Sequence, residues 1–353
     1  MAATDNWNLP LPPLALSMGD PAGVGPEIAL RAWAALRDEG PAFMMVGPPE
    51  VFDAALRRLG MDAAIEQVAS AAIARHTFPK ALPILPRPLN APTLPTPGEP
   101  DTAHAEAILD SIATAVRLTR EGETAAIVTN PIAKSVLYKA GFPHPGHTEY
   151  LAQLVAAPGV AAPEPVMMLV GGGLRVALAT IHMPLREAVE ALRADRLERL
   201  AEIVHRALQV DFGLPSPRIA FTGLNPHAGE EGALGREEIE IINPAADTLR
   251  GRGVDISDAR PADTIFAEAL AGRFDAVIAM THDQGLIPVK TLDFWGGVNT
   301  TLGLPVIRTS PDHGTAFDIA ARGGARPDSL ISAIRLAGEM AARRRAHAET
   351  ARV

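Results

Sequence analysis

Short apolar runs alternate along the chain with longer segments of helical periodicity. The runs are bounded by Gly, Pro or Asp, as buried strands often are, and they include Leu14–Met18, Ala42–Val46, Thr124–Thr129, Arg218–Phe221, Ala276–Met280 and Leu304–Ile307. The periodic segments predict helices over Pro49–Leu59, Asp101–Glu121, Arg186–Gln209, Asp263–Leu270 and Ser329–Arg345. This alternation favours an α/β fold with a largely parallel sheet.

Three segments interrupt the alternation. Two adjacent apolar runs, Pro165–Val170 and Arg175–Ile181, are joined by Gly171–Gly173 and predict a hairpin. The proline-dense stretch 79–100 is either a linker or an arm on the surface, and we prefer the arm because α/β patterning continues on both sides. A glycine-rich turn, GDPAGVG, follows the first strand. It could direct backbone N–H groups at an anion, although plain turn chemistry explains it equally well.

Polar side chains gather after two of the predicted strands, within residues 275–320. The first strand is followed by Thr281, His282, Asp283, Gln284 and then Lys290; the second is followed by Arg308, Thr309, Asp312, His313 and Gly314. Open α/β sheets build their sites from the segments that leave the carboxyl ends of their strands. We therefore expect the functional site in this part of the chain.

Composition narrows the function classes. The chain has 353 residues, a formal charge of −9 and no cysteine, which excludes disulfides, thiolate nucleophiles and cysteine-bound metals. The acidic balance and the lack of basic runs argue against nucleic acid as a partner. No apolar run approaches the length of a membrane span, and the N-terminus lacks a basic signal region. We expect a cytoplasmic protein without a membrane partner.

The ten histidines include three with a shared context. His182, His227 and His282 each follow a predicted buried strand and lie in a polar loop. Three imidazoles that leave open coordination positions are typical of catalytic metal sites. The alternative is that each is an ordinary hydrogen-bonding loop residue. The remaining histidines include four that we expect at the surface, namely His76, His104, His205 and His347.

Other residues suit an anionic ligand. His147 and His313 stand at the starts of presumed helices, where a helix N-terminus favours negative charge, although a purely structural role explains either residue alone. Lys290, Asn299 and Arg308 add positive and polar groups, and a guanidinium can grip carboxylate or phosphate with two hydrogen bonds.

Long motifs carry a family resemblance over residues 14 to 335. They are SMGDPAGVGPEI, VTNPIAK, GHTEYLA, ATIHMPLREA, GLNPHAGEEGALGREE, PADTIF, THDQGLIPVK and GVNTTLGLPVIRTSPDHGTAFDIA. The chain resembles the 4-hydroxythreonine-4-phosphate dehydrogenase family of pyridoxal phosphate biosynthesis. The resemblance implies an NAD-dependent oxidation and decarboxylation of 4-phosphohydroxy-L-threonine, a small anionic phosphorylated substrate, to 3-amino-2-oxopropyl phosphate.

The resemblance also assigns residues. The family's metal-ligand histidines match His182, His227 and His282, which implies one divalent ion per subunit, Zn, Co or Mg. Its substrate-binding positions match His147, Thr148, Lys290, Asn299 and Arg308, and Lys290 is our candidate for the catalytic proton carrier. HGTAFDIA is similar to the HGSAPDIA segment of isopropylmalate and isocitrate dehydrogenases, which implies that His313, Gly314 and Asp318 contact NAD, or NADP.

The same likeness implies a two-domain α/β/α fold of the isocitrate/isopropylmalate dehydrogenase-like type, with the active site in the interdomain cleft. We expect a discontinuous first domain of residues 1–133 plus 305–353, and a second, 134–304, that carries the metal histidines and the interface of a homodimer. The chain departs from many relatives at Phe294-Trp295-Gly296-Gly297. A sister dehydrogenase acting on another phosphorylated hydroxy acid or a dihydrodiol acid therefore stays open, as does a metal-dependent hydrolase or transferase on the same scaffold.

Overall fold

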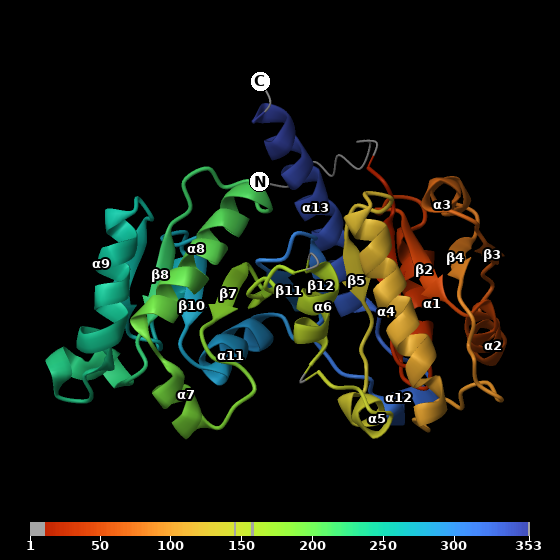
Figure 1. The fold of residues 1–353 in the computed structure, drawn as a ribbon, viewed down its shortest axis with the longest axis horizontal. Helices are drawn as coiled ribbons and strands as arrows, with labels where there is room; N and C mark the ends of the chain where they lie inside the picture. The colour runs from red at the N-terminus through yellow and green to blue at the C-terminus, as the bar shows by residue number, and fades with distance from the viewer. Residues whose placement is uncertain (1–10, 145, 157–158, 352–353) are drawn as a thin grey trace. The chain divides into compact units, whose positions relative to one another are not determined.

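The structure is a computed structural model that describes residues 11–144, 146–156 and 159–351 (Figure 1). The chain forms two compact units: unit 1 comprises residues 1–164 and 304–342, and unit 2 comprises 165–303 and 343–353. These limits differ from the expected ones mainly at 134–164, which belong to unit 1. The helix α6 (His147–Val155) in this segment packs on α4 (Ala105–Arg120), where Arg120 Nη1 donates to the Leu154 carbonyl at 3.2 Å.

The sheet of unit 1 is parallel throughout. Its strand order is β3-β4-β2-β1-β5-β12, with bounds β1 Leu14–Ser17, β2 Phe43–Gly47, β3 Ile65–Gln67, β4 Leu82–Pro86, β5 Ile127–Thr129 and β12 Arg308–Pro311. Every position of β1, β2 and β5 is buried. Strands covered on both faces are expected to be apolar without alternation, and this is why the sequence patterns of β1 and β2 were recognisable as strands.

Helices cover the unit 1 sheet. Their bounds are α1 Gly25–Leu36, α2 Pro49–Leu59, α3 Ala71–Thr77, α4, α5 Lys134–Lys139, α6, α12 Phe317–Arg322 and the part of α13 (Asp328–Thr350) that ends at Ala342, together with the 3₁₀ turn η1 (Thr102–His104) before α4. The helix α4 packs on β1, β2 and β5 (Figure 1). Asp101 caps the start of η1, since its carboxylate accepts from the Ala103 amide at 2.9 Å. The predicted start of this helical segment is therefore confirmed.

The proline-dense stretch is only partly an arm. Its first part forms β4, which pairs with β2 and β3, and this strand was not predicted because proline lacks the amide donor that a strand needs. The remainder runs past the glycine-rich turn, where the Gly98 amide donates to the Ala22 carbonyl at 2.8 Å. Contact with the body of unit 1 favours an arm over a linker.

The sheet of unit 2 is mixed. Its order is β11-β6-β7-β10-β8-β9, with bounds β6 Val166–Gly171, β7 Leu174–Leu178, β8 Ile219–Thr222, β9 Ile256–Arg260, β10 Ala276–Ala279 and β11 Val298–Leu302. The pairs β11-β6 and β6-β7 are antiparallel, and β7-β10, β10-β8 and β8-β9 are parallel. The hairpin predicted from Gly171–Gly173 is therefore confirmed.

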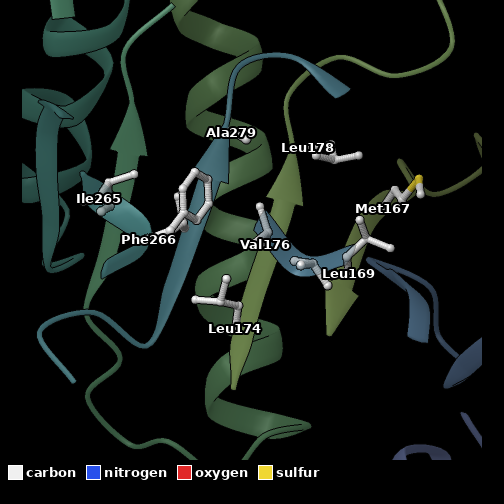
Figure 2. Close-up of a cluster of buried hydrophobic side chains, with 11 residues drawn as sticks. Met167, Leu169, Leu174, Val176, Leu178, Ile265, Phe266 and Ala279 are labelled. Carbon is white, nitrogen blue, oxygen red and sulfur yellow. The ribbon is translucent and has the colours of Figure 1, made fainter. Parts of the chain in front are cut away.

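One apolar cluster of unit 2 lies on the face of its sheet that α10 and α11 cover. Figure 2 shows Leu174 and Val176 of β7 near Phe266 of α10, with Leu178 further along the strand, and Val289 of α11 belongs to the same cluster. The helical segments of unit 2 are α7 Leu185–Ala191, α8 Ala194–Val210, η2 Pro226–Gly232, η3 Glu238–Ile242, α9 Asn243–Gly251, α10 Ile265–Leu270, α11 His282–Leu292 and the end of α13.

The single helix predicted over Arg186–Gln209 is wrong, because the chain leaves helical geometry at Leu192 and Arg193, whose ψ angles are 126° and 141°. Within the described residues, no helix is both long enough and apolar enough to cross a membrane.

Candidate functional site

Three neighbouring parallel strands of unit 2 lead into the three predicted metal ligands. The strands lie in the order β7-β10-β8. His182 follows β7, His282 begins α11 directly after β10, and His227 lies in η2 after β8. Because parallel strands end at one edge of a sheet, the fold delivers all three segments to the same edge.

Hydrogen bonds join these strand ends to each other. Thr180 Oγ1 donates to the Met280 carbonyl at 2.7 Å, and the Met280 amide donates to Thr222 Oγ1 at 3.1 Å. Gln284 Nε2 donates to the Gly223 carbonyl at 3.0 Å, while its Oε1 accepts from the Thr281 amide at 3.0 Å in a capping box at the start of α11. Polar residues after each strand thus hold the loops in register, which explains why this edge is polar although the strands are apolar.

His182 and His282 lie close together. Their ring centroids are 5.5 Å apart, with the ring planes inclined by 46°. The Nδ1 atom of His282 pairs with the Asp283 carboxylate at 2.9 Å, which leaves Nε2 as the nitrogen for a ligand. His182 has a φ of +39°, a left-handed conformation that costs a non-glycine residue energy and often marks a functional site.

His227 lies in a tightly constrained loop. Its φ is +52°, and residues 227 to 231 all have positive φ values. The buried carboxylate of Glu238 holds the loop entrance, accepting from the amides of Leu224 and Asn225 at 2.8 Å each. The Nδ1 atom of His227 pairs with Glu230 at 2.8 Å, so Nε2 again remains for a ligand.

The donor set fits a divalent metal ion in part. Two imidazoles are adjacent, and a carboxylate on Nδ1 of both His227 and His282 is the usual second partner of a metal-binding histidine. However, the described residues contain no group of three or more histidines, aspartates or glutamates already close enough to hold an ion. The ligand assignment of His182, His227 and His282 therefore stays a prediction.

Lys290 and Asn299 also belong to unit 2. Lys290 lies on α11, not in a loop, and its Nζ stands 5.7 Å from the centroid of the Phe294 ring. Since His282 begins the same helix eight residues earlier, the two side chains start about 12 Å apart along the axis. Asn299 lies in β11, opposite Leu169 of β6.

Arg308 is the first residue of β12 in unit 1. The strand predicted over Leu304–Ile307 is wrong, because the strand begins at Arg308 and the preceding residues form a bend. The guanidinium is buried and donates from Nε and Nη2 to Thr129 Oγ1 at 3.1 and 2.7 Å. Burial lowers the pKa of Arg308 to about 10, so it stays charged at neutral pH.

The other predicted ligand-binding residues are also in unit 1. His147 and Thr148 begin α6, but their side chains lie outside the described residues. The Nδ1 atom of His313 donates to the Gly314 carbonyl at 2.9 Å, and Asp318 pairs with Arg322 at 3.0 Å on the exposed side of α12. The side chains of His313 and Asp318 are exposed on the surface of unit 1, where a cofactor can reach them.

The structure joins the glycine-rich turn to this predicted cofactor segment. The Val24 amide donates to the Thr315 carbonyl at 2.9 Å, and a Cβ on Gly23 would lie 2.9 Å from the same oxygen. Only glycine allows so close an approach. The two motifs were read separately in the sequence, and the backbone contact indicates that they form one surface.

Three buried polar residues of unit 1 were missed by sequence reasoning. Asp20 Oδ2, Asn130 Oδ1 and His104 Nδ1 are buried and have no hydrogen-bond partner in the part of the chain that the structure describes. His104 was expected at the surface, but its ring packs inside with Nε2 3.4 Å from the Thr93 carbonyl. Burial raises the pKa of Asp20, although the Ala22 amide and the positive field of His104 oppose the shift. Asp20 and Asn130 follow the strands β1 and β5, and a polar residue at the end of a parallel strand is the sequence feature that could have pointed to them.

Comparisons with known proteins agree with the motif resemblance. The family model for pyridoxal phosphate biosynthetic protein PdxA matches residues 39–337. A 4-hydroxythreonine-4-phosphate dehydrogenase of Methylorubrum extorquens (strain PA1) is 52% identical over 332 residues, covering 94% of this chain and 95% of that protein. The crystal structure of the Klebsiella pneumoniae 4-hydroxythreonine-4-phosphate dehydrogenase is 39% identical with a TM-score of 0.84, covering 93% of this chain and 99% of that one.

A protein with a different substrate is also similar. The terephthalate 1,2-cis-dihydrodiol dehydrogenase of Burkholderia xenovorans LB400 is 31% identical with a TM-score of 0.63, covering 92% of this chain and 97% of that one. The resemblance inferred from the motifs and the predicted α/β fold are both confirmed. The match to the family model, over most of the sequence, and the near full-length relatives lead to one conclusion: this chain belongs to the PdxA family of pyridoxal phosphate biosynthetic proteins.

Proposed function

We propose that the chain is an NAD-dependent decarboxylating dehydrogenase that converts 4-phosphohydroxy-L-threonine to 3-amino-2-oxopropyl phosphate in pyridoxal phosphate biosynthesis. The observation that carries the proposal is the delivery of three histidines from three neighbouring parallel strands, two of them with rings 5.5 Å apart. Family membership supplies the reaction class, because the relatives named above are dehydrogenases.

His182, His227 and His282 would hold one divalent ion. Imidazole ligands suit Zn²⁺ or Co²⁺ better than Mg²⁺. Such an ion supplies Lewis acidity to an oxygen of the substrate, and NAD⁺ supplies the hydride acceptor. The protein's own part is to orient the rings: Asp283 and Glu230 accept from Nδ1 and so direct Nε2 of His282 and His227 toward the ligand.

The cationic residues would bind and protonate the substrate. Lys290 is our candidate for the proton carrier during decarboxylation, because an ammonium group can donate a proton to a carbon that becomes negatively charged. Arg308, Asn299, His147 and Thr148 would hold the phosphate and carboxylate groups. The guanidinium of Arg308 is suited to this because Thr129 already fixes its plane through two hydrogen bonds.

We assign the adenosine half of NAD to His313, Gly314 and Asp318. Their position next to the glycine-rich turn supports this, because the Val24 amide donates to the Thr315 carbonyl and so joins the two motifs. The turn itself does not offer free amides to the cofactor's phosphates, since the Asp20, Ala22, Gly23 and Val24 amides all have acceptors within unit 1. A carboxylate at Asp318 suits the ribose hydroxyls of NAD better than the extra phosphate of NADP. We also predict a cytoplasmic location.

A homodimer is the expected assembly. The helix α11 and the turn after it present Ile287, Leu292 and Trp295 with 63%, 49% and 51% of their surface exposed, which is typical of an interaction surface. Sedimentation velocity is the measurement. We expect a dimer that Ile287→Glu dissociates, while Val160→Glu, at an equally exposed site of unit 1, leaves it intact; a monomeric wild-type protein would contradict the proposal.

A second candidate is a dehydrogenase acting on a ring dihydrodiol acid. The similarity to the terephthalate dihydrodiol dehydrogenase supports it, and the aromatic pair Phe294 and Trp295 beside Lys290 would suit a ring substrate. The two candidates share the cofactor and metal and differ only in the substrate.

One experiment separates these possibilities. NADH formation is followed by absorbance with 4-phosphohydroxy-L-threonine, before and after EDTA treatment and after addition of Zn²⁺, Co²⁺ or Mg²⁺. We expect turnover that EDTA abolishes and a divalent ion restores. NAD⁺ binding without turnover would favour the dihydrodiol candidate, and absence of NAD⁺ binding would refute the dehydrogenase proposal.

A further inference from the structure

The turn that ends α11 has a defined shape. Asp293 leaves helical geometry at φ −145° and ψ 77°, and its Oδ1 accepts from the Gly296 amide at 2.7 Å. A Cβ on Gly296 would lie 2.6 Å from Asp293 Oδ2, so any larger residue would displace the carboxylate. The acceptor at Asp293 and the glycine at 296 together fix the path of the two residues between them.

Those two residues are aromatic and lie outside the core. Phe294 and Trp295 have 63% and 51% of their surface exposed, and their rings meet edge to face with centroids 5.0 Å apart. An exposed phenylalanine gains little from burial within its own unit. Besides belonging to the surface proposed for the dimer, the Phe294 ring makes a specific contact, because it lies under the Lys290 ammonium at 5.7 Å from centroid to Nζ.

This geometry restricts the lysine. A cation within about 6 Å of a ring centroid is attracted to the negative face of the ring. Lysine has a long flexible stem, and holding it in one rotamer has an entropic cost that such a contact offsets. Lys290 and Phe294 are four residues apart, a spacing that lets a side chain just past the helix end fold back over the last turn.

We propose that Phe294 is a positioning residue that holds the Lys290 ammonium in place for proton transfer, and that the Asp293–Gly296 turn sets the ring's orientation. The inference rests on the proposed function of Lys290 as a proton carrier. Phe294 itself touches no reacting atom. It acts by increasing the fraction of time that Nζ spends in one place.

The contact can be tested without turnover. The sequence contains four lysines, Lys80, Lys134, Lys139 and Lys290, so reductive methylation with ¹³C-formaldehyde yields four lysine dimethylammonium signals, in addition to that of the N-terminal amine, and all keep their charge. Lys290→Arg assigns the signal of interest. An aromatic ring shields nuclei above its face, so Phe294→Leu should shift the Lys290 signal downfield and leave the other three unchanged. An unmoved Lys290 signal would overturn the proposal.

Kinetics on the unmethylated full-length enzyme test the consequence. Phe294→Leu should lower kcat about two- to fivefold, the range expected for an exposed cation–π contact, with the KM for NAD⁺ unchanged. Phe294→Tyr keeps the ring face and should restore kcat. Full kcat in Phe294→Leu, or no rescue by tyrosine, would contradict the positioning role.

Trp295→Leu is the matched control. It removes the neighbouring ring of the same turn, which has 51% of its surface exposed against 63% for Phe294. We expect the Lys290 signal to stay near its wild-type position and kcat to fall less than in Phe294→Leu. If kcat falls equally in the two variants, the loss comes from removing exposed aromatic surface or from weakening the dimer, and not from the contact with Lys290. Sedimentation of each variant separates the dimer effect. If the wild type has no turnover, the proposed function fails while the methyl signals still decide whether Phe294 holds Lys290.

Discussion

Glu238 controls the loop that presents His227, and its replacement by glutamine offers a sharp test. The carboxylate is buried; Oε1 accepts from the Leu224 and Asn225 amides at 2.8 Å each, and Oε2 accepts from Asn225 Nδ2 at 3.0 Å. Glutamine has the same size but no charge. If its oxygen keeps the two amides, its NH₂ group must face the NH₂ group of Asn225.

Asn225 cannot relieve this conflict by turning over. Its Nδ2 also donates to Glu237 at 2.7 Å, a bond that the flipped amide would lose. Two charge-assisted bonds therefore weaken by about 1 kcal/mol each and a third is lost, so we expect Glu238→Gln to destabilise the loop by roughly 2 to 3 kcal/mol.

Hydrogen exchange of the Leu224 and Asn225 amides measures this locally. A loss of about 2 kcal/mol corresponds to roughly thirtyfold faster exchange when exchange proceeds through local opening. Because Glu238 holds the entrance of the loop that carries the predicted metal ligand His227, the Zn²⁺ affinity of Glu238→Gln should fall about 10- to 100-fold. Glu240→Gln is the control, since Glu240 pairs only with exposed Arg236 among the contacts described. Wild-type exchange at both amides in Glu238→Gln would refute the reasoning.

Three further predictions follow from single side chains. His227→Ala should abolish metal-dependent NADH formation while changing stability by less than about 0.5 kcal/mol, because 68% of the side chain is exposed; full activity would remove His227 from the metal site. Asp20→Asn should raise the free energy of unfolding of unit 1 at pH 7 but not at pH 3. Because the pKa of Asp20 is higher in the folded than in the unfolded state, the wild-type protein has its full stability below the unfolded pKa and loses part of it as the pH rises through the folded pKa. Denaturant unfolding at both pH values checks the sign, and an equal effect at both would contradict it. Gly285→Ala should destabilise unit 2 by about 1 to 3 kcal/mol, because the new Cβ would lie 2.4 Å from Leu178 Cδ2 and 3.1 Å from Val176 Cγ1; unchanged denaturant midpoints would show that α11 moves away freely.

The local pattern of apolar residues was enough to predict strands in which every residue is buried. Residues of β1, β2 and β10 are apolar at nearly every position because both faces of each strand are covered, and such runs are recognisable without any tertiary knowledge. The hairpin of β6 and β7 was equally accessible, since glycines with positive φ at 172 and 173 have few other uses between two apolar runs.

The local pattern did not predict a strand where buried polar residues are hydrogen-bonded to partners elsewhere in the chain. The strand β12 reads Arg308-Thr309-Ser310-Pro311, which resembles a loop, yet all four residues are buried. Thr309 Oγ1 donates to the Ala333 carbonyl of α13, and Arg308 donates to Thr129 of β5. Partners 24 and 179 residues away remove the cost of burying these groups, and no local window contains them.

The candidate site divides in the same way. Local patterns along the chain were enough to predict that three imidazoles follow buried strands, because those strands are recognisable apolar runs. Lys290 and Arg308 were less accessible, since Lys290 lies within α11 and Arg308 begins a strand of polar residues. The folded chain was needed to learn that β7, β10 and β8 are neighbours, that Thr180 and Thr222 join their ends, and that Phe294 lies against Lys290. Strand order and side-chain contacts depend on packing between segments far apart in the chain, and that information is absent from any local pattern.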